Sequence, residues 1–558
     1  MDEVPIIDIF AGPGGLAEGF SSLISEDNNR VFKIALSIEK DENAHRTLKL
    51  RSFYRQFPIN QAPADYYSFI RGEITIDQLY NNHPVETHLA SEEAWCGTLG
   101  TPDETETNGV TNEEVDERIT IALNGNRNWV LIGGPPCQAY SLVGRARRQE
   151  IILDGATDKR VGLYKEYLRI IAVHSPAVFV MENVKGLLSA RTEEENIFQK
   201  ILADLKDPVN VCIAEGIVAD ENQPHINYRI YSLTTEATNF DDDGNPIFRP
   251  IDYLIKSENY GVPQRRHRVI LLGVRQDFEG PQNILQPQEE VTLASVIDNL
   301  PAVRSGITRS FSHFTMVEGK DGTLKKRRHY DRIEDTPENW ANYINGFSEE
   351  LDTFLEPVQN NIDYPVTLGL NYLPHNNYNL PNQHILSDWF ADNNLGGVLH
   401  HVSRKHLLED LKRYLFAARY AQINGTFPRL DDYRDAGNDL LPDHENAGSG
   451  KFTDRFRVQL PNISATTVTS HISKDGHYFI HYDPTQCRSL TVREAARIQT
   501  FPDNYYFCGE RTSQFHQVGN AVPPYLAYQI AEIVWNILNP RIAENENIPQ
   551  EIEEINAR

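Results

Sequence analysis

Short apolar runs alternate with amphipathic segments in the first half of the chain. The predicted strands lie at 5–10, 32–38, 129–132, 177–181 and 269–274. The predicted helices lie at 16–23, 44–55, 164–173 and 194–205. A strand, a helix and a second parallel strand form the βαβ unit of α/β proteins. The pattern therefore predicts a parallel sheet covered by helices.

The α/β alternation fades near Val291 and does not resume before about Asn462. Asn, Asp, Pro and Tyr become more frequent there, and one amphipathic helix is predicted at 406–420. We expect a smaller domain, inserted before the sheet fold is complete. The predicted division is a catalytic and cofactor-binding domain at 1–290, a small domain at 291–504 and a return to the catalytic domain at 505–558. The return contains a predicted helix at 523–538 and an acidic tail.

Residues 91–118 are rich in acidic side chains. We interpret most of this segment as a surface insertion in the first domain. Its carboxylates are Glu92, Glu93, Asp103, Glu104, Glu106, Glu113, Glu114, Asp116 and Glu117.

The composition excludes several classes of protein. The 558 residues are 40% hydrophobic, which is enough to bury a sizeable core. No apolar run is long enough to predict a membrane span. The five cysteines are scattered and form no C-x-x-C pair, so neither a zinc site nor a disulfide framework is predicted. We expect a cytoplasmic protein with free thiols, no metal site and no membrane partner.

The net charge of -26 opposes nonspecific attraction to nucleic acid. A nucleic-acid-binding function therefore requires local basic patches. An ordinary solvated charge run is the alternative for each candidate. The candidates are Arg145, Arg147 and Arg148; Arg265, Arg266 and Arg268; and Lys325, Lys326, Arg327 and Arg328.

A glycine-rich turn follows the first predicted strand, with Gly12, Gly14 and Gly15 before a helix. Glycines let the backbone approach a ligand, and a helix N-terminus presents free N–H groups. Glu39, at the end of the second strand, could accept hydrogen bonds from ribose hydroxyls. The spacing predicts an adenosine-containing cofactor and does not distinguish NAD from others. A tight turn without a ligand is the alternative.

Two further strand ends carry reactive side chains. Cys137 follows Gly133-Gly134-Pro135-Pro136, and Glu182 follows the apolar run 178–181. Open α/β sheets bind ligands at the carboxyl ends of their strands. We therefore expect Cys137 to be an exposed nucleophile and Glu182 to serve in acid–base chemistry. A buried cysteine and a surface or capping glutamate are the alternatives.

Six ordered motifs resemble those of the cytosine-specific methyltransferases that form 5-methylcytosine. They are DIFAGPGGL at 8–16, GGPPCQAYS at 133–141, MENV at 181–184, QRRHR at 264–268, LTVREAARIQTFPD at 490–503 and GNAVPP at 519–524. The resemblance implies an α/β, Rossmann-like S-adenosylmethionine-dependent methyltransferase sheet with an inserted target-recognition domain.

The resemblance also implies which residues contact S-adenosylmethionine. They are Phe10, Gly12, Gly14, Gly15, Leu16, Glu39, Pro136, Leu163, Asn520 and Ala521. The family's short acidic cofactor motif before the cysteine is not assigned, because the acidic residues of 91–118 obscure it.

The same resemblance implies roles in catalysis. Cys137 would add its thiolate to C6 of cytosine, which makes C5 nucleophilic toward the methyl donor. Glu182 would hold and protonate N3. Arg268 would fix O2 and orient Glu182, and Arg266 and Gln264 would brace the pocket. The sequence does not identify the base that removes the C5 proton.

The target carbon of cytosine lies inside a stacked duplex, so the base must be flipped out. We expect the segment 139–162 to close behind the flipped base; an ordinary basic surface loop is the alternative. The predicted DNA- or base-contacting residues are Gln138, Ser141, Arg145, Arg147, Arg148, Asn183 and Gln264.

Two later groups of residues support this arrangement. Arg493, Glu494 and Arg497 share one helical face and are predicted to form an organising salt-bridge network. A group of hydroxyl side chains could contact DNA phosphates or could be ordinary strand residues. It comprises Thr466, Thr467, Thr469 and Ser470.

We predict a DNA (cytosine-5-)-methyltransferase that uses S-adenosylmethionine and double-stranded DNA. A restriction–modification or host-defence system would supply a cognate endonuclease or defence proteins as partners. A tRNA cytosine-5 methyltransferase is the near alternative, although the long middle region favours DNA. An NAD-dependent oxidoreductase would explain Glu39 and the glycines but not the later motifs. A catalytically inactive DNA-binding scaffold is opposed by the complete set Cys137, Glu182 and Arg268.

Overall fold

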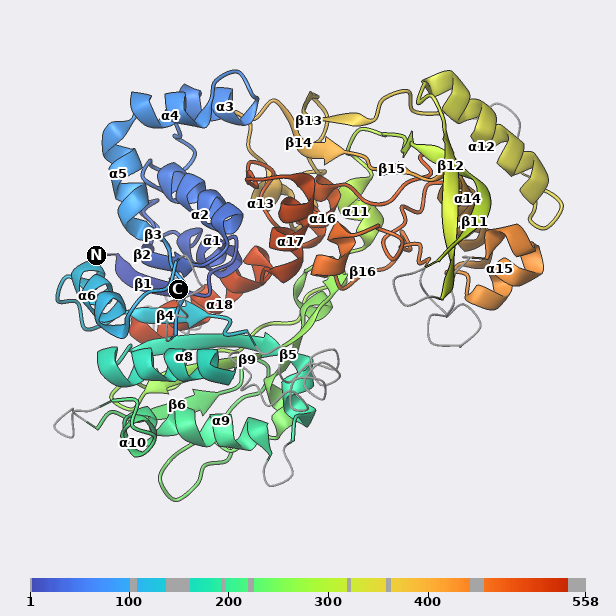
Figure 1. Cartoon of the computed structure of the whole chain (residues 1–558). Helices are drawn as coiled ribbons and strands as arrows, with labels where there is room; N and C mark the ends of the chain where they lie inside the picture. The colour runs from blue at the N-terminus through green and yellow to red at the C-terminus, as the bar shows by residue number, and fades with distance from the viewer. Residues whose placement is uncertain are drawn as a thin grey trace, which may run out of the picture.

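A mixed sheet organises the first half of the chain (Figure 1). The computed structural model describes residues 3–100, 108–136, 161–191, 196–218, 225–318, 323–357, 363–441 and 456–539. Within these residues the sheet has eight strands in the order β3-β2-β1-β4-β5-β9-β6, and β7 also pairs with β9. The strands are β1 Val4–Ile9, β2 Phe32–Glu39, β3 Ala94–Cys96, β4 Val130–Gly133, β5 Val178–Val184, β6 Tyr228–Tyr231, β7 Leu254–Lys256 and β9 His267–Arg275. The predicted strands and the α/β class are confirmed.

The two faces of the sheet bury alternate residues of each strand. Ile6, Val130 and Val178 pack under one layer of helices, whereas neighbours such as Ile7 and Leu131 pack under the other. The first layer is α1 Gly15–Ser21 and α18 Pro524–Leu538. The second layer is α6 Asn112–Leu123, α8 Val161–His174, α9 Ile197–Lys206 and α10 Pro208–Ala214. Burial on both faces explains why these strands are almost entirely apolar.

The strand order reverses between β1 and β4. β1, β2 and β3 lie side by side in parallel on one side of this point, and β4 and β5 continue in parallel on the other. β9 runs antiparallel to β5. Ligands bind beyond the carboxyl ends of the strands at such a reversal. The fold therefore places a binding crevice where the glycine turn follows β1 and the Gly-Pro-Pro turn follows β4.

The prediction of a surface insertion at 91–118 is wrong for most of the described part of that segment. Residues 94–96 form β3, which pairs with β2, and Glu93 just before them is buried. Residues 112–123 form α6, whose Val115, Ile119 and Leu123 pack in the core of the sheet domain. The acidic side chains on the outer face of α6 hid this apolar stripe.

Four helices between β2 and β3 extend the sheet domain toward the small domain. They are α2 Glu42–Arg55, α3 Ala64–Ile70, α4 Ile76–Asn82 and α5 Pro84–Glu93. Tyr67 of α3 donates a hydrogen bond of 2.9 Å to the Asp392 carboxylate in the small domain. This contact shows that the two parts share an interface beyond the sheet.

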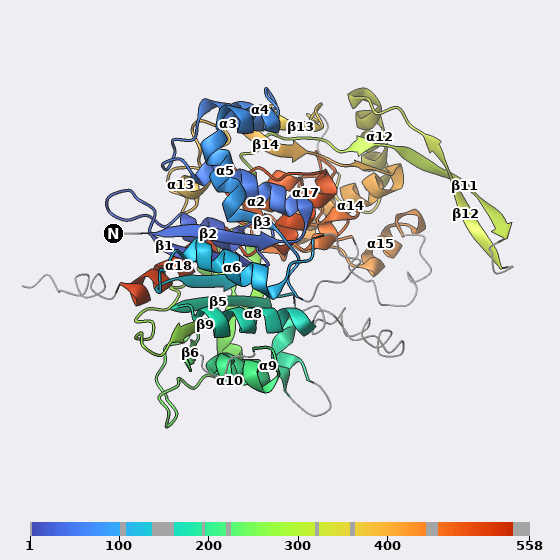
Figure 2. The same ribbon diagram turned by 60° about the vertical axis from the view of Figure 1, so that its left-hand side comes forward.

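The middle of the chain forms a second layer of structure beside the sheet (Figure 1). Its strands are short except for a hairpin of β11 and β12, which projects from the body in Figure 2. The helices of this region are α11 Leu293–Ile297, α12 Pro337–Leu351, α13 Ser387–Phe390, α14 Leu408–Asn424, α15 Leu430–Ala436, α16 Val492–Ile498 and α17 Arg511–Asn520. The strands are β8 Gln264–Arg265, β10 Gly306–Ile307, β11 Arg309–Glu318, β12 Leu324–Arg332, β13 Gly369–Pro374, β14 Gly397–Val402, β15 Lys405–His406 and β16 Ala465–Thr466.

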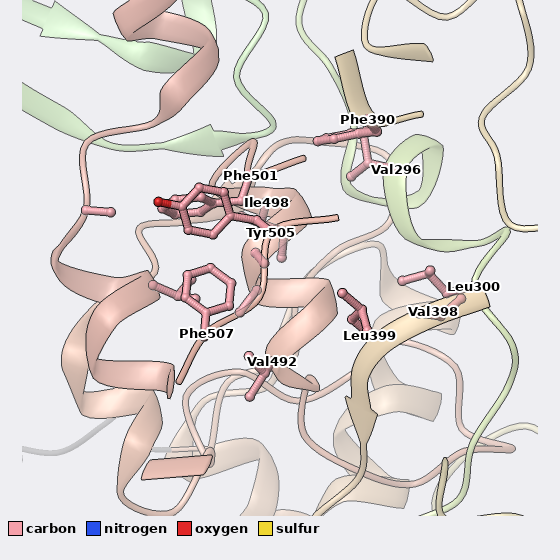
Figure 3. Packing of buried hydrophobic residues seen from close by; sticks show 14 of the residues in the cluster. Val296, Leu300, Phe390, Val398, Leu399, Val492, Ile498, Phe501, Tyr505 and Phe507 are labelled. Atoms are coloured by element: carbon pink, nitrogen blue, oxygen red, sulfur yellow. The ribbon is translucent and has the colours of Figure 1, made fainter. Parts of the chain in front are cut away.

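A large apolar core joins the small domain to the sheet domain (Figure 3). It contains Phe390 from α13, Leu399 from β14 and Ile498 from α16, together with Leu50 and Phe53 from α2. The segment expected back in the catalytic domain from residue 505 instead begins with α17, which packs on α16. The chain returns to the sheet only with α18, which packs against α1.

Buried ion pairs reinforce the helix α16. Arg488 contacts Glu494 at 2.6 Å, and Arg497 contacts Asp503 at 2.6 Å. The Arg493 guanidinium donates to the carbonyl oxygens of Leu399, Pro502 and Tyr505. The three residues of the predicted network thus have a structural role, but their described ion pairs run to Arg488 and Asp503 and not to one another. No described helix is both long enough and apolar enough to cross a bilayer.

Replacing Arg497 should destabilise the protein strongly. Arg497→Met leaves the buried Asp503 carboxylate without its strongest partner, and loss of one member of a buried pair costs about 3–5 kcal/mol. The matched control is Arg434→Met, because Arg434 pairs with Asp431 at an exposed position. That change should cost at most about 1 kcal/mol. Urea unfolding of the two variants measures both values, and equal losses would contradict the assigned role of Arg497.

Candidate active site

The turn after β1 has an unusual backbone. Phe10, Gly12 and Gly14 all have positive φ angles, of 56°, 57° and 91°. A side chain at Gly12 would meet no heavy atom within 4 Å, so open space lies beside its Cα. The strained conformation of Phe10, a residue type that rarely adopts it, is typical of a ligand-binding turn.

The C-terminal part of the chain packs against the glycine turn and holds it in place. A Cβ atom on Gly15 would lie 2.2 Å from the Val522 carbonyl oxygen, so only glycine fits there. Leu16 and Ala521 are buried at this contact, and Asn520 beside them is exposed. The first and last family motifs therefore meet in space, although about 500 residues separate them in the sequence.

Glu39 closes the crevice from the end of β2. Its two carboxylate oxygens accept hydrogen bonds of 2.8 Å from the backbone N–H groups of Gly12 and Asp41. Burial raises the pKa of Glu39, and these two backbone donors oppose the rise. The carboxylate thus lies directly against the glycine turn, where a ribose would bind.

Two further predicted cofactor residues lie after β4 and at the start of α8. Pro136 is half-buried after β4, and Leu163 is half-buried in the first turn of α8. A Cβ atom at Gly100 would lie 3.7 Å from the Leu163 side chain, so Leu163 faces the segment that follows β3. The glycine turn, the Glu39 carboxylate and these two apolar side chains are groups that suit an adenosine ligand.

Glu182 and Arg268 form an ion pair at the end of β5. Arg268 Nε lies 2.8 Å from Glu182 Oε1, and both side chains are partly exposed. They come from neighbouring antiparallel strands, in which Val184 pairs with Arg268. A Cβ atom on Gly134 would lie 3.0 Å from Glu182 Oε2, so the turn after β4 packs directly on the carboxylate.

Asn183 points away from this pair. It is buried, and its side-chain oxygen accepts a hydrogen bond of 2.8 Å from the Val184 N–H. Adjacent strand residues face opposite sides of a sheet, so Asn183 cannot share the surface of Glu182. The prediction that Asn183 contacts DNA finds no support in this geometry.

Gln264 and Arg266 hold protein segments together and do not face an open surface. Gln264 is fully buried and bonds with Ile498, Gln499 and Val468. The Arg266 guanidinium donates to the carbonyl oxygens of Val468, Gly519 and Asn520. Burial lowers the pKa of Arg266 well below its usual value, and the nearby Arg268 acts in the same direction.

This placement agrees with the expectation that Gln264 braces the pocket. Its fully buried amide bonds to the protein through both its oxygen and its nitrogen, so the geometry gives no support to a DNA contact. Arg266 matches the expectation that it braces the pocket, because its partners are backbone carbonyls. Neither residue touches Glu182 through a hydrogen bond or ion pair among the described contacts.

Asp8 is a buried carboxyl group of β1, just before the glycine turn, for which the sequence predicted no individual role. It is 1% exposed, and neither carboxyl oxygen has a hydrogen-bond partner among the described residues. Burial raises its pKa well above the usual value, while Arg55 opposes this effect. The signal in the sequence that could have drawn attention to Asp8 is its position as a single acidic residue within the Ile-rich strand β1.

The hydroxyl groups of 466–467 bond within the protein. Thr466 contacts Gln459 at 2.9 Å, and Thr467 donates to the Arg265 carbonyl oxygen. These two hydrogen bonds favour the interpretation of Thr466 and Thr467 as structural residues. Among the described residues, no group of three or more His, Cys, Asp or Glu could hold a metal ion.

Several predicted site residues lie outside the described residues. They are Cys137, Gln138, Ser141, Arg145, Arg147 and Arg148, together with most of the proposed closing segment 139–162.

Comparison with known proteins identifies the family. The model of the C-5 cytosine-specific DNA methylase family matches residues 106–208 and 248–535. Type II methyltransferase M.Bpa9945I of Bacillus paralicheniformis is 31% identical, over 96% of this chain and 99% of its own length. M.DdeI of Desulfomicrobium norvegicum is 27% identical, over 97% and 91%. DNA (cytosine-5-)-methyltransferase M.ApeKI of Aeropyrum pernix is 26% identical, over 75% and 83%.

Glu182 and Arg268 both lie within the residues that the family model matches. The chain belongs to the C-5 cytosine-specific DNA methylase family.

Proposed function

We propose that the chain transfers a methyl group to carbon 5 of a cytosine flipped out of duplex DNA, with Cys137 as the nucleophile. The observation that carries the proposal is the contact between the turn after β4 and the Glu182–Arg268 pair. Gly134 packs on the Glu182 carboxylate, and Cys137 follows Gly134 by three residues. The nucleophile Cys137 and the acid Glu182 would thus lie close together at the carboxyl ends of the adjacent strands β4 and β5.

Glu182 and Arg268 suit one face of a cytosine ring. The carboxyl group would bind N3 and share a proton with it, while the guanidinium would donate to O2. Thiolate addition from Cys137 to C6 places negative charge on N3 and O2, where these two groups stabilise it. The bond from sulfur to C6 forms as the C5–C6 double bond gives its electron pair to C5. C5 would use this electron pair to take the methyl group. A base would then remove the C5 proton, and the electron pair of that C–H bond would re-form the C5–C6 double bond and expel the thiolate from C6.

S-adenosylmethionine is the cofactor we propose for the crevice beside β1. When bound, it supplies a methyl group on a positively charged sulfur. Phe10, Gly12 and Gly14 would cradle it, and the Glu39 carboxylate would accept hydrogen bonds from its ribose. β1, β4 and β5 are neighbours, with strands about 4.8 Å apart, so this crevice lies about 10 Å from Glu182.

The relatives named as type II methyltransferases suggest a restriction–modification system for this chain. A cognate endonuclease would then recognise the same DNA sequence, and methylation would protect the host DNA. A cytoplasmic location, where DNA and S-adenosylmethionine are both present, stays a prediction.

The two alternative functions, tRNA methylation and an NAD-dependent oxidoreductase, have less support. The matching family model is one of DNA methylases, and the relatives that cover most of the chain carry DNA or type II methyltransferase names. An NAD-dependent oxidoreductase does not account for this match. Methylation of tRNA is tested by the experiment that follows.

Cys137→Ala should lower methyl transfer to duplex DNA by more than about a thousandfold, because the variant lacks the nucleophile. Transfer of a labelled methyl group to duplex DNA and to tRNA, measured side by side, should give activity only on DNA. The matched control is Cys212→Ala, a buried cysteine of α10, which should keep wild-type activity. Activity of Cys137→Ala, or transfer to tRNA alone, would overturn the proposal.

Glu182→Gln should lower kcat by about 100-fold or more, the usual contribution of acid–base catalysis. The amide keeps the size of the carboxyl group but neither carries its charge nor donates a proton from oxygen. Glu166→Gln is the matched control, because Glu166 pairs with Arg169 at 3.2 Å and its side chain is 13% exposed, close to the 14% of Glu182. Single-turnover methyl transfer measures both. Similar rates for the two variants would contradict the role of Glu182.

Glu39→Gln should weaken binding of S-adenosylmethionine about tenfold or more, since a charged hydrogen bond contributes about 1.5–3 kcal/mol. Titration calorimetry with the cofactor alone measures this without turnover. Glu42→Gln, an exposed change in the first turn of α2, is the control and should leave the affinity unchanged. Wild-type affinity in Glu39→Gln would rule out the proposed ribose contact.

A further inference from the structure

A basic groove lies at the base of the β11–β12 hairpin, away from the Glu182 pair. It is a cavity of about 690 Å³ between the hairpin, the start of α14, the segment after residue 472 and the start of α17. Its cationic side chains are Arg309, Arg332, Arg404, Lys405, Lys474 and Arg511. We use the name basic groove for the cavity that these six residues line.

The charges of the basic groove are poorly balanced within the protein. Only two carboxylates, Asp410 and Asp475, line it among the described residues. Asp410 also pairs with Arg413 at 2.9 Å, outside the lining. Lys405 pairs with Asp335 at 2.9 Å. Arg404 is buried and donates to the carbonyl oxygens of Ile472, Ser473 and Lys474. The other five cations are exposed, and they outnumber the carboxylates that line the groove. A concave surface lined by one sign of charge focuses the potential and attracts a polyanion.

One face of the hairpin continues the basic groove. Arg309 and Arg332 lie opposite each other at its base, and the Arg309 guanidinium lies over the Tyr330 ring at 4.2 Å. Lys326 and Arg332 are an even number of residues apart on β12, so they share this face. Lys326 lies over the Phe314 ring at 5.2 Å, with Phe314 38% exposed.

The hairpin is long enough to follow a duplex. β11 has 10 residues, and at about 3.3 Å per residue it reaches about 30 Å from the groove. Figure 2 shows it extending from the body without cover from other elements. Almost every residue of β12 is exposed. A row of cations on an uncovered ribbon matches the regular charges of a nucleic acid backbone.

The basic groove is connected to the active site through one short segment. Arg266, two residues from Arg268, bonds with the Val468 carbonyl oxygen at 3.0 Å. Lys474 lines the groove only six residues later, a span of at most about 20 Å. The groove therefore lies near the Arg266–Arg268 segment, at a separation comparable with one helical turn of DNA, about 34 Å.

We propose that the basic groove and the Lys326 face of the hairpin hold the phosphate backbone of duplex DNA outside the recognition sequence. The inference rests on the proposed function, since it needs duplex DNA as the substrate. These contacts add affinity without sequence preference, because phosphates are the same at every base pair. They let a chain with a net charge of -26 hold a polyanion.

The test compares two double variants of the same hairpin in the full-length protein. Arg309→Gln/Arg332→Gln removes two cations from the groove. Lys325→Gln/Arg327→Gln removes two from the opposite face and is the matched control. Fluorescence anisotropy with a 40-base-pair duplex of arbitrary sequence gives the affinity at several salt concentrations.

The groove variant should bind roughly tenfold more weakly, and its slope of log affinity against log salt should fall by about 2, near 0.9 per lost phosphate contact. The affinity and the salt slope of the control variant should fall by less than half as much as those of the groove variant. Lys474→Gln, outside the hairpin, should lower the slope by about 1 and keeps the test valid if the hairpin variant misfolds. An unchanged slope in the groove variants, or an equal loss in the control, would overturn the inference.

Methyl transfer separates this outcome from failure of the proposed function. At saturating DNA the groove variant should keep kcat within about threefold of wild type, while its KM for DNA rises. A wild-type protein that methylates no DNA refutes the proposed function, whereas the salt slopes still decide whether the groove binds a duplex. Tight binding of an acidic protein with no loss of DNA affinity in the groove variant would assign the groove to another partner.

Discussion

The structure depends on the buried polar side chains of the segment between β8 and β9. Gln264 and Arg266 lie inside the protein, where an unpaired donor or acceptor would cost several kcal/mol. Both find partners in backbone groups, near Val468 on one side and near Gly519 on the other. Three distant parts of the chain are thereby held together. The small domain keeps a fixed position beside the ends of β4 and β5. Arg268 of the Glu182–Arg268 pair follows Arg266 by two residues, in β9, so the same anchoring holds the pair in place.

This anchoring explains a division of roles among the family motifs. Some residues face the crevice, as Glu39 and Glu182 do, and their partners there are few. Others, such as Arg497 and Gln264, are buried, and their hydrogen-bond partners belong to the protein itself. Charged side chains serve both purposes in this protein. Burial and hydrogen-bond partners distinguish them, whereas residue type does not.

Much of the fold could be predicted from the sequence because its central strands are apolar on both faces and end in distinctive turns. The prediction failed for β3 and α6, since β3 has three residues and the acids of α6 mask its Val115-Ile119-Leu123 stripe. For Gln264 the expected bracing role agrees with its burial, whereas the expected DNA contact, suggested by a polar residue in a basic motif, finds no support. The tertiary contacts that bury Gln264 come from segments about 200 residues away, which no local pattern reveals.

The central claim is that this chain forms 5-methylcytosine in DNA. Bisulfite sequencing of DNA, from cells that lack other cytosine-5 methyltransferases and express this protein, tests it most directly. The account predicts protected cytosines at one position of a single recurring sequence, in every copy of that sequence. DNA without protected cytosines from cells that contain the folded protein would contradict the account.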